Sequence, residues 1–239
     1  MKMNKPKSIL AIIPVRGGSK RIPKKNIKPL NGKPLIYYTI EQAKQSVFVN
    51  RIIVSSDDDE ILKISSQYEV EVDKRPSILA TDTANTVDVL IELVKRLEKQ
   101  EKYKPDVIVL LQATTPLRVS EDIDACIKKL IDSGSDSIDT FTRIKDHPYY
   151  AFTIDKDHNA IPLDPKNFTK RSQDLPDLYV ENGAVYVVTR DTLINEHSLY
   201  GKKHQGHVMP QKRSIDIDEE IDFELAEFFI TREQNGNKN

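Results

Sequence analysis

The sequence has little cysteine, no long apolar run and almost no net charge, and each shortage excludes a class of protein. Its 239 residues hold one cysteine, Cys126, which rules out an internal disulfide framework and suits a reducing compartment. The apolar stretch nearest the start, Ile9 to Pro14, is too short for a signal-peptide core or a membrane span. With 36 Lys and Arg against 37 Asp and Glu, no global basic field favours nucleic acid. We expect a cytoplasmic protein with no membrane and no nucleic-acid partner.

The commonest nucleotide and metal motifs are missing as well. The glycine, lysine and hydroxyl spacing of a P-loop does not occur, and neither does the G-x-G-x-x-G fingerprint of dinucleotide-binding folds. No group of cysteines and histidines has the spacing of a zinc site. An NAD-binding oxidoreductase has only the general α/β pattern in its favour and is set aside.

Apolar runs of strand length alternate with segments of helical periodicity along most of the chain. This alternation is typical of an α/β fold with a mostly parallel sheet flanked by helices, and we interpret residues 1–239 as a single domain. The expected strands are 9–13, 51–55, 107–111 and 184–188, and the expected helices are 34–46, 57–68, about 87–97, one from 120, and 221–230.

The alternation breaks from about residue 137 to residue 180. This segment is rich in proline, aspartate, histidine and aromatic residues, and has only short extended stretches such as Tyr150 to Ile154. We interpret it as an excursion from the main sheet that serves dimerisation and the sugar pocket.

The loop after the first expected strand carries the chemistry of a phosphate site. Ligands of open α/β sheets bind where strands end, and here Gly17 and Gly18 allow a close backbone approach. Five cations lie within ten residues, namely Arg16, Lys20, Arg21, Lys24 and Lys25. Backbone amides combined with guanidinium and ammonium groups suit a triphosphate. The alternative is a basic surface loop with no ligand.

Two further segments contain groups that suit a nucleotidyl-transfer site. Asp216 and Asp218 are two residues apart, so in an extended segment both carboxylates reach a common Mg²⁺; the alternative is an acidic helix start. Gln112 and Thr114 follow a buried strand and suit a sugar or a pyrimidine edge, unless they only form a turn before Pro116.

Several motifs, in this order, resemble those of the acylneuraminate cytidylyltransferases, or CMP-sialic acid synthetases. They run from Ile12 to about Phe229, which is nearly the full chain. The motifs are Ile12 to Asn26, Lys33 to Ile36, Val54 to Asp57, Arg75-Pro76 with Ala80 to Thr83, Leu111 to Arg118, Gln173 to Pro176, Glu181 to Tyr186, and Ser214 to Asp218.

The resemblance implies a fold of the nucleotide-diphospho-sugar transferase type, which is glycosyltransferase A-like, and a homodimer. It implies an enzyme that transfers CMP from CTP to an acidic nine-carbon 2-keto sugar and releases pyrophosphate. The implied contacts are Arg16, Gly17, Gly18 and Lys20 with the triphosphate; Asn26, Arg75, Thr86 and Gln112 with the nucleotide or its junction with the sugar; Asn182 and Tyr186 with the sugar; and Asp216 and Asp218 with Mg²⁺.

The sugar is less well defined than the reaction. Thr114, Arg171 and Gln173 are further candidates for binding it, Arg171 through the sugar carboxylate unless it is a surface arginine. Ser172 stands where many members of the family have arginine. N-acetylneuraminate, legionaminate and pseudaminate all stay open. The alternatives are another keto-acid sugar such as 3-deoxy-octulosonate, or a non-catalytic nucleotide-sugar binder.

Overall fold

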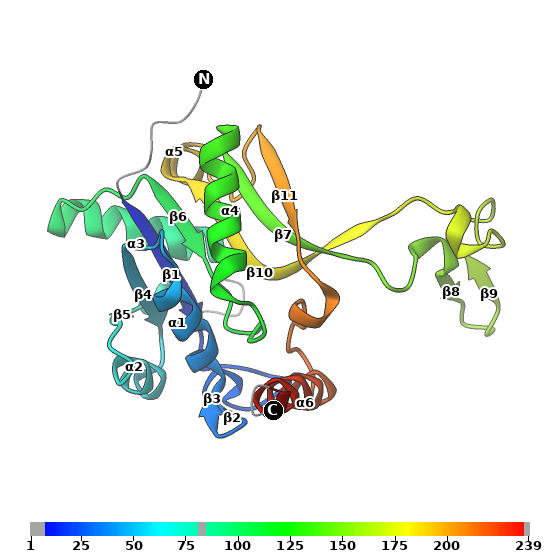
Figure 1. Cartoon of the computed structure of the whole chain (residues 1–239), viewed down its shortest axis with the longest axis horizontal. Coiled ribbons are helices and arrows are strands. Elements are labelled where there is room, and N and C mark those ends of the chain that lie inside the picture. Colours follow the sequence, from blue (N-terminus) through cyan, green and yellow to red (C-terminus); the bar gives the residue numbers. More distant parts are fainter. Residues whose placement is uncertain (1–7, 81–84, 237–239) are drawn as a thin grey trace.

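A seven-stranded sheet forms the centre of the protein, with the strand order β11-β7-β10-β6-β1-β4-β5 (Figure 1). The computed structural model describes residues 8–80 and 85–236. All neighbouring strands are parallel except β10, which runs antiparallel to both β6 and β7. The strands are β1 (Ile9–Val15), β4 (Arg51–Ser56), β5 (Glu71–Lys74), β6 (Val107–Leu110), β7 (Ser137–Arg143), β10 (Tyr179–Thr189) and β11 (His204–Val208). The predicted mostly parallel α/β fold is confirmed.

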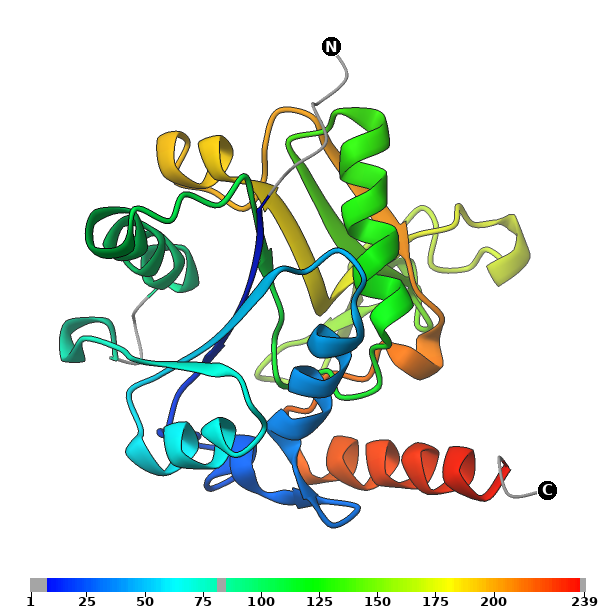
Figure 2. The ribbon, with the colours of Figure 1, turned by 60° about the vertical axis from the view of Figure 1, so that its left-hand side comes forward.

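Helices cover both faces of this sheet (Figure 2). They are α1 (Leu35–Gln45), α2 (Asp59–Ser66), α3 (Thr86–Glu101), α4 (Ser120–Ser133), α5 (Arg190–Asn195) and α6 (Glu220–Gly236). The apolar sides of α1 and α4 pack on one face, and those of α3 and α5 pack on the other. Cys126 is buried on α4 as predicted, which raises the pKa of its thiol. No helix in the described part of the chain combines the length and the apolar character that a membrane crossing needs.

A third apolar cluster lies beyond the edge of the sheet and holds α6. Phe223, Ala226 and Ile230 of this helix pack against Ile22 and Ile217. The cluster also includes Leu30 and Leu35, which flank the short hairpin of β2 (Pro29–Leu30) and β3 (Lys33–Pro34). It therefore brings the loop after β1 against the segment that precedes α6.

The excursion begins later than the sequence suggests. Residues 137–143, predicted to lie outside the sheet, form β7 within it. The strand is polar, with Asp139 and Thr140 buried, so its hydrophobicity is too low to mark it as a central strand. Residues 144–178, here called the arm, project from the ends of β7 and β10 (Figure 1). The arm carries the hairpin of β8 (Phe152–Ile154) and β9 (Ala160–Pro162) and the short helices η3 (Pro148–Tyr150) and η4 (Ser172–Asp174).

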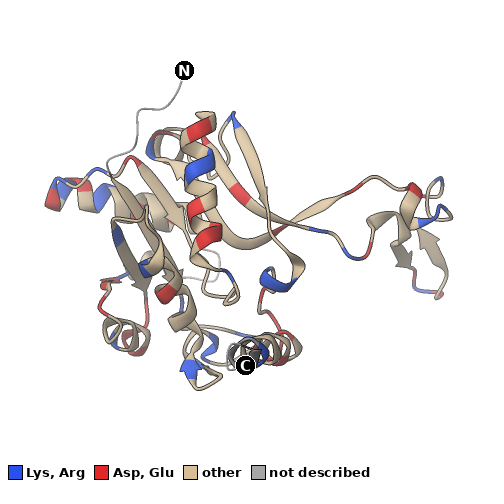
Figure 3. Cartoon of the chain, in the orientation of Figure 1, with Lys and Arg blue, Asp and Glu red and all other residues tan. Residues whose placement is uncertain are grey.

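Positive and negative side chains alternate over the helices, the loops and the arm (Figure 3). This distribution agrees with a net charge of −1 and gives no single-sign face in this view.

One acid in the core lacks the partners that buried charges usually have. Asp139 is fully buried between Tyr186 of β10 and Gly206 of β11. Neither carboxylate oxygen has a hydrogen-bond partner among the described residues, and His204 Nε2 lies 3.4 Å from Oδ2. Burial, with a smaller contribution from the charge of Glu181, raises the pKa of Asp139 to about 8. The carboxyl is therefore protonated at neutral pH.

The substitution Asp139→Asn tests this protonation state. A carboxyl whose pKa is higher in the folded than in the unfolded chain costs stability as pH rises from about 4 toward 8. We compare the free energy of unfolding of the variant with that of the original chain. The difference should shift in favour of the variant between pH 5 and pH 8, by on the order of 1 kcal/mol or more. Urea unfolding at both pH values measures this difference. The comparison is repeated in chains that also carry His204→Asn, which removes the titrating imidazole near Asp139. An advantage that does not change with pH would contradict the assignment.

Candidate active site

The loop after β1 is fastened to the start of α2. The Gly17 N–H donates to Asp57 Oδ1 at 3.2 Å. Asp58 caps α2 by accepting from the N–H groups of Glu60 and Ile61. A Cβ built at Gly17 would lie 2.4 Å from Asp58 Oδ2, whereas one built at Gly18 has no atom within 4 Å. Only glycine at position 17 lets the loop approach the helix start this closely.

Two buried polar side chains hold the same loop to the sheet edge. Asn26 Nδ2 donates to the Arg16 carbonyl at 3.0 Å. Arg75 Nη2 donates to the carbonyls of Val15 at 3.1 Å and Ser55 at 2.9 Å, at the ends of β1 and β4. Burial lowers the pKa of Arg75, partly offset by nearby carboxylates. Among the described residues its hydrogen bonds go to neutral carbonyl oxygens, so the guanidinium suits an anion bound at this edge.

A cleft of about 350 Å³ opens at this edge, above the carboxyl ends of the strands. Six of the predicted site residues line it, so segments far apart in the sequence do converge. They are Arg16, Asn26, Arg75, Thr86, Gln112 and Thr114. Ser19 and Lys25 line it as well. Of the family motif at Ala80 to Thr83, residues 81–83 lie outside the described residues.

Residues 214–218, here called the aspartate segment, meet the loop of residues 16–25, here called the cationic loop, beside this cleft. Ile217 N–H donates to the Thr114 carbonyl at 2.8 Å, and Lys25 Nζ donates to the Ile217 carbonyl at 2.6 Å. Asp218 pairs with Arg21 at 2.9 Å and with Lys25 at 3.4 Å. The loop that contains Lys20 and the segment that contains Asp216 thus belong to one site.

Gly183 lies where the side chains of Gln112 and Asp216 approach each other. Its φ of +70° falls in the left-handed region that favours glycine, and it lies at an irregularity of β10. A Cβ built there would lie 3.5 Å from Gln112 Oε1 and 3.7 Å from Asp216 Oδ2. The Gln112 amide and the Asp216 carboxylate therefore share the space above this glycine.

The two aspartates differ in their electrostatics. Burial raises the pKa of Asp216, aided by the charge of Asp218 and opposed by Thr114 and Lys25. The Thr114 hydroxyl lies beside the carboxyl without the geometry of a full hydrogen bond. Burial also acts to raise the pKa of Asp218, but Arg21 and Lys25 outweigh it and hold that pKa below its usual range. Asp216 is thus the carboxylate whose charge is less compensated.

Asn182 does not line the cleft in the way the resemblance suggested. The side chain is buried, its Nδ2 donates to Ser214 Oγ at 2.9 Å, and its Oδ1 accepts from the Ala184 N–H at 3.1 Å. It joins β10 to the aspartate segment. Tyr186 is nearly buried and its hydroxyl lies 3.5 Å from Glu181 Oε2. Burial raises the pKa of Tyr186, and the charge of Asp216 contributes, so the tyrosine lies near the cleft.

Arg171 and Gln173 lie on the arm and not with the other predicted residues. Arg171 is exposed and pairs with Asp174 at 2.9 Å. Gln173 lines a separate hollow of about 470 Å³ with Arg143 and Gln211. Within a single chain the arm carries both residues away from the sheet (Figure 1), and their contact with the sugar stays a prediction.

Arg118 is a residue of the site that the sequence did not single out. It is buried to 1% exposure, and its Nη1 donates to the carbonyls of Gln112 at 3.1 Å and Ala184 at 2.7 Å. Its Nη2 donates to Thr39 Oγ1 at 2.7 Å. The guanidinium therefore fixes the strand end that carries Gln112. An arginine directly after Pro116 and Leu117, within a family motif, was the available signal.

Comparison with known proteins identifies the family and several relatives of this chain. The cytidylyltransferase family model matches residues 10–236. Post-translational flagellin modification protein B of Campylobacter coli is 35% identical over 95% of this chain and 96% of its own length. Pseudaminic acid cytidylyltransferase of Campylobacter jejuni is 33% identical over 91% and 94%. N-acylneuraminate cytidylyltransferase of Streptococcus agalactiae is 32% identical over 90% of this chain but only 51% of its own length.

Two further similarities bear on substrate and fold. CMP-N,N'-diacetyllegionaminic acid synthase of Legionella pneumophila is 34% identical over 92% of this chain and 94% of its own length. A solved CMP:2-keto-3-deoxy-manno-octonic acid synthetase complexed with CTP superimposes with a TM-score of 0.71. It covers 95% of this chain and 100% of that one at 18% identity, which supports the fold alone.

The two neighbouring glycines provide a test of the loop geometry. The added methyl of Gly17→Ala must displace Asp58 from its capping position, so we expect a loss of about 1–3 kcal/mol in free energy of unfolding. Gly18→Ala meets open space and should stay within about 0.5 kcal/mol of the original chain. Chemical denaturation of both variants measures the difference. Equal stability of the two would show that the loop does not pack on α2 as described.

Proposed function

The chain belongs to the cytidylyltransferase family, and from this premise we propose that it transfers CMP from CTP to a nine-carbon 2-keto acid sugar and releases pyrophosphate. The single observation that carries the proposal is the convergence of the Gly17–Gly18 loop with the aspartate segment at one cleft, through the contact of Lys25 with Ile217. This cleft presents cations, backbone amides and a carboxylate to the same bound molecule.

The cationic loop supplies the groups that a triphosphate needs. Arg16 lines the cleft and Lys20 lies in the same loop, so both suit contact with the phosphates. Attack by the anomeric hydroxyl on the α-phosphorus leaves negative charge on the departing pyrophosphate. Fixed guanidinium and ammonium groups stabilise that charge without having to reorganise. Asn26, Arg75 and Thr86 line the part of the cleft that we assign to the nucleotide.

The aspartate pair fits Mg²⁺, the cofactor that we propose. Carboxylate oxygens are the ligands that Mg²⁺ prefers, and it commonly uses one or two of them together with substrate phosphates. Asp216 lies exposed beside the cleft with little compensation for its charge, and Asp218 would exchange its cationic partners for the ion. When bound there, Mg²⁺ would neutralise phosphate charge and orient the triphosphate. Among the described residues alone, no group of three or more acidic, histidine or cysteine side chains forms a metal cluster, so phosphate oxygens would complete the site.

Gln112, Thr114 and Tyr186 form the side of the site that we assign to the sugar. Their amide, hydroxyl and phenol groups suit a polyhydroxylated acceptor. The relatives named above act on sialic, pseudaminic and legionaminic acids, and we propose a substrate from this class. Since CTP is a soluble cellular metabolite, we propose the cytoplasm as the place of reaction, without a membrane or nucleic-acid partner.

We further propose that the arm forms a homodimer and completes the sugar site of the partner chain. Phe152, Ile154, Ile161 and Leu163 are 46–63% exposed on the arm, which is costly for an element with so little core of its own. Arg171 and Gln173 lie on the same arm. Its projection from the sheet would bring both residues to a second chain, where Arg171 suits the carboxylate of the acidic sugar.

The reaction and its metal carboxylate are tested together by a substrate panel. We expect pyrophosphate release with CTP and Mg²⁺ on at least one sialic, legionaminic or pseudaminic acid, and none with 3-deoxy-octulosonate. Asp216→Asn should lower turnover by about 100-fold or more, because it removes the carboxylate assigned to the ion. Asp132→Asn is the matched control, since that exposed aspartate pairs with Lys128 on α4, and it should keep full activity. Release on 3-deoxy-octulosonate alone, or an Asp216→Asn variant as fast as the original enzyme, contradicts the assignment.

The arm is tested by placing charges on both faces of its hairpin, because the register of β8 and β9 puts Ile154 and Ile161 on opposite faces. The double substitution Ile154→Asp and Ile161→Asp should convert the dimer to a monomer in sedimentation experiments, because an interface core does not accommodate unpaired carboxylates. Affinity for the acidic sugar should fall while affinity for CTP is kept. Val47→Asp places a charge on a valine that is 82% exposed outside the arm and serves as the control. A chain that is monomeric before substitution, or a variant that stays dimeric, would refute the proposal.

A further inference from the structure

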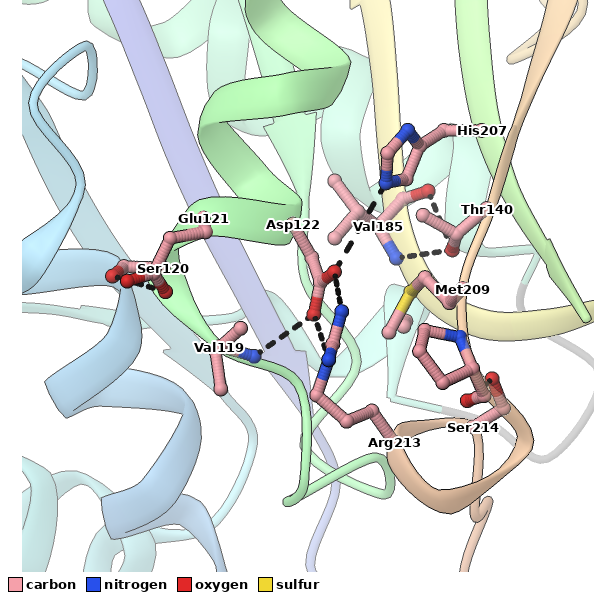
Figure 4. Close-up of polar contacts among 12 residues, drawn as sticks. Val119, Ser120, Glu121, Asp122, Thr140, Val185, His207, Met209, Arg213 and Ser214 are labelled. Carbon is pink, nitrogen blue, oxygen red and sulfur yellow. Dashed lines mark hydrogen bonds and ion pairs between the residues drawn. The ribbon is translucent and has the colours of Figure 1, made fainter.

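An ion pair between a buried aspartate and a one-third-exposed arginine joins the aspartate segment to α4 (Figure 4). Asp122, in the first turn of α4, is 2% exposed. Its two carboxylate oxygens accept from Arg213, Nη2 at 2.8 Å and Nε at 3.0 Å, which is a two-bond fork. Asp122 also accepts from the Val119 N–H at 3.1 Å, so the carboxylate is locked in place by its own helix. His207 approaches the same carboxylate at 4.0 Å.

The location of Arg213 in the chain gives this pair its importance. Arg213 ends the short helix η5 (Gln211–Arg213), three residues before Asp216. The intervening Ser214 accepts from Asn182 Nδ2 at 2.9 Å and donates to the Pro210 carbonyl at 2.9 Å. The segment before the metal carboxylate is thus tied to α4 by an ion pair and to β10 by one neutral hydrogen bond.

The other side of Asp216 is held independently. Ile217, directly after it, is fixed by its N–H to the Thr114 carbonyl and by its carbonyl to Lys25 Nζ. Ile217 is also fully buried against α6. Asp216 therefore lies between two anchored points. Without the Arg213 fork, the entry to the segment keeps the contacts of Asn182 with Ser214, of Gln211 Nε2 with the Arg143 carbonyl at 3.1 Å and of Lys212 with the Phe229 ring, but these three do not tie it to α4.

We propose that Arg213 and Asp122 are positioning residues that set the orientation of the Asp216 carboxylate for Mg²⁺ bound with CTP. Neither residue touches the cleft, and each acts through the segment between Arg213 and Asp216. The inference rests on the proposed function, because it assigns a purpose to this pair only if Asp216 holds the ion. A charged pair suits this task because the planar fork fixes direction as well as distance, which a lysine in the same place would not do.

Isothermal titration with CTP in the presence of Mg²⁺ and with CTP in EDTA tests the proposal without relying on turnover. Arg213→Lys keeps the charge but loses the fork, and we expect it to bind MgCTP about tenfold more weakly, as for other residues that orient a metal ligand. Its affinity for CTP in EDTA should stay within about twofold, because the loop contacts are unchanged. An Arg213→Lys variant that binds MgCTP like the original chain overturns the proposal, as does an equal loss in both conditions.

Two further variants separate positioning from stability. Arg190 forms a two-bond fork with Glu98 that is also partly shielded from solvent. Its backbone N–H donates to the carbonyl of Asp106, just before the amino end of β6 and so at the end of the strands away from the cleft. Arg190→Lys should lose comparable stability and keep both affinities. The double variant Asp122→Asn with Arg213→Met leaves no uncompensated buried charge, and its asparagine carbonyl still accepts from Val119, so it should be more stable than Arg213→Met alone. It should nevertheless bind MgCTP as weakly as Arg213→Lys or more so, and recovery of full affinity would overturn the proposal.

These titrations distinguish failure of the inference from failure of the proposed function. If the original chain binds CTP no more tightly with Mg²⁺ than in EDTA, the metal site itself is wrong and the inference falls with it. If Mg²⁺ strengthens binding in the original chain and equally in Arg213→Lys, only the positioning role is refuted.

Discussion

The contact of Lys25 with the backbone of Ile217 is the interaction on which the rest of the site depends. It joins two segments that are 192 residues apart in the sequence, and its length of 2.6 Å is that of a charge-assisted hydrogen bond. One of these segments carries the cations of the loop after β1 and the other carries Asp216. If these segments lay apart, the site could not hold a triphosphate and its counter-ion, because these need both segments at once.

Packing explains why this contact persists. The loop after β1 contributes Ile22 to the same apolar cluster as Ile217 and the inner face of α6. Burying these side chains together provides the larger part of the free energy that holds the loop against the aspartate segment. The polar contacts then select one arrangement among several compact ones. The long reach of α6 across the end of the molecule is thus a structural requirement of the site (Figure 2).

Much of the fold could be predicted from the sequence, and the part that could not is polar. The strands 9–15, 51–56 and 107–110 are continuous apolar runs, and the helices they alternate with have clear apolar faces. The strands β7 and β11 were not predicted, because Asp139, Thr140 and His204 give them the composition of loops.

The loop after β1, Gln112 and Asp216 were proposed from the sequence because glycines, amides and alternating acids are typical of nucleotide and metal binding. Arg118, Asp122 and Arg213 act through contacts between distant segments, and such pairings are visible only in three dimensions. The assignment of Arg171 and Gln173 to the sugar stays a prediction, because a single chain does not show which site the arm reaches.

The central claim is that one triphosphate is gripped between the glycine loop and Asp216. A crystal structure of the protein with CTP and Mg²⁺ tests it most directly. We expect the β- and γ-phosphates against the amides of Gly17 and Gly18 and the side chains of Arg16 and Lys20, with the ion bridging a phosphate oxygen and the Asp216 carboxylate. A triphosphate bound elsewhere, or bound in the cleft with Asp216 turned away from it, would contradict the account.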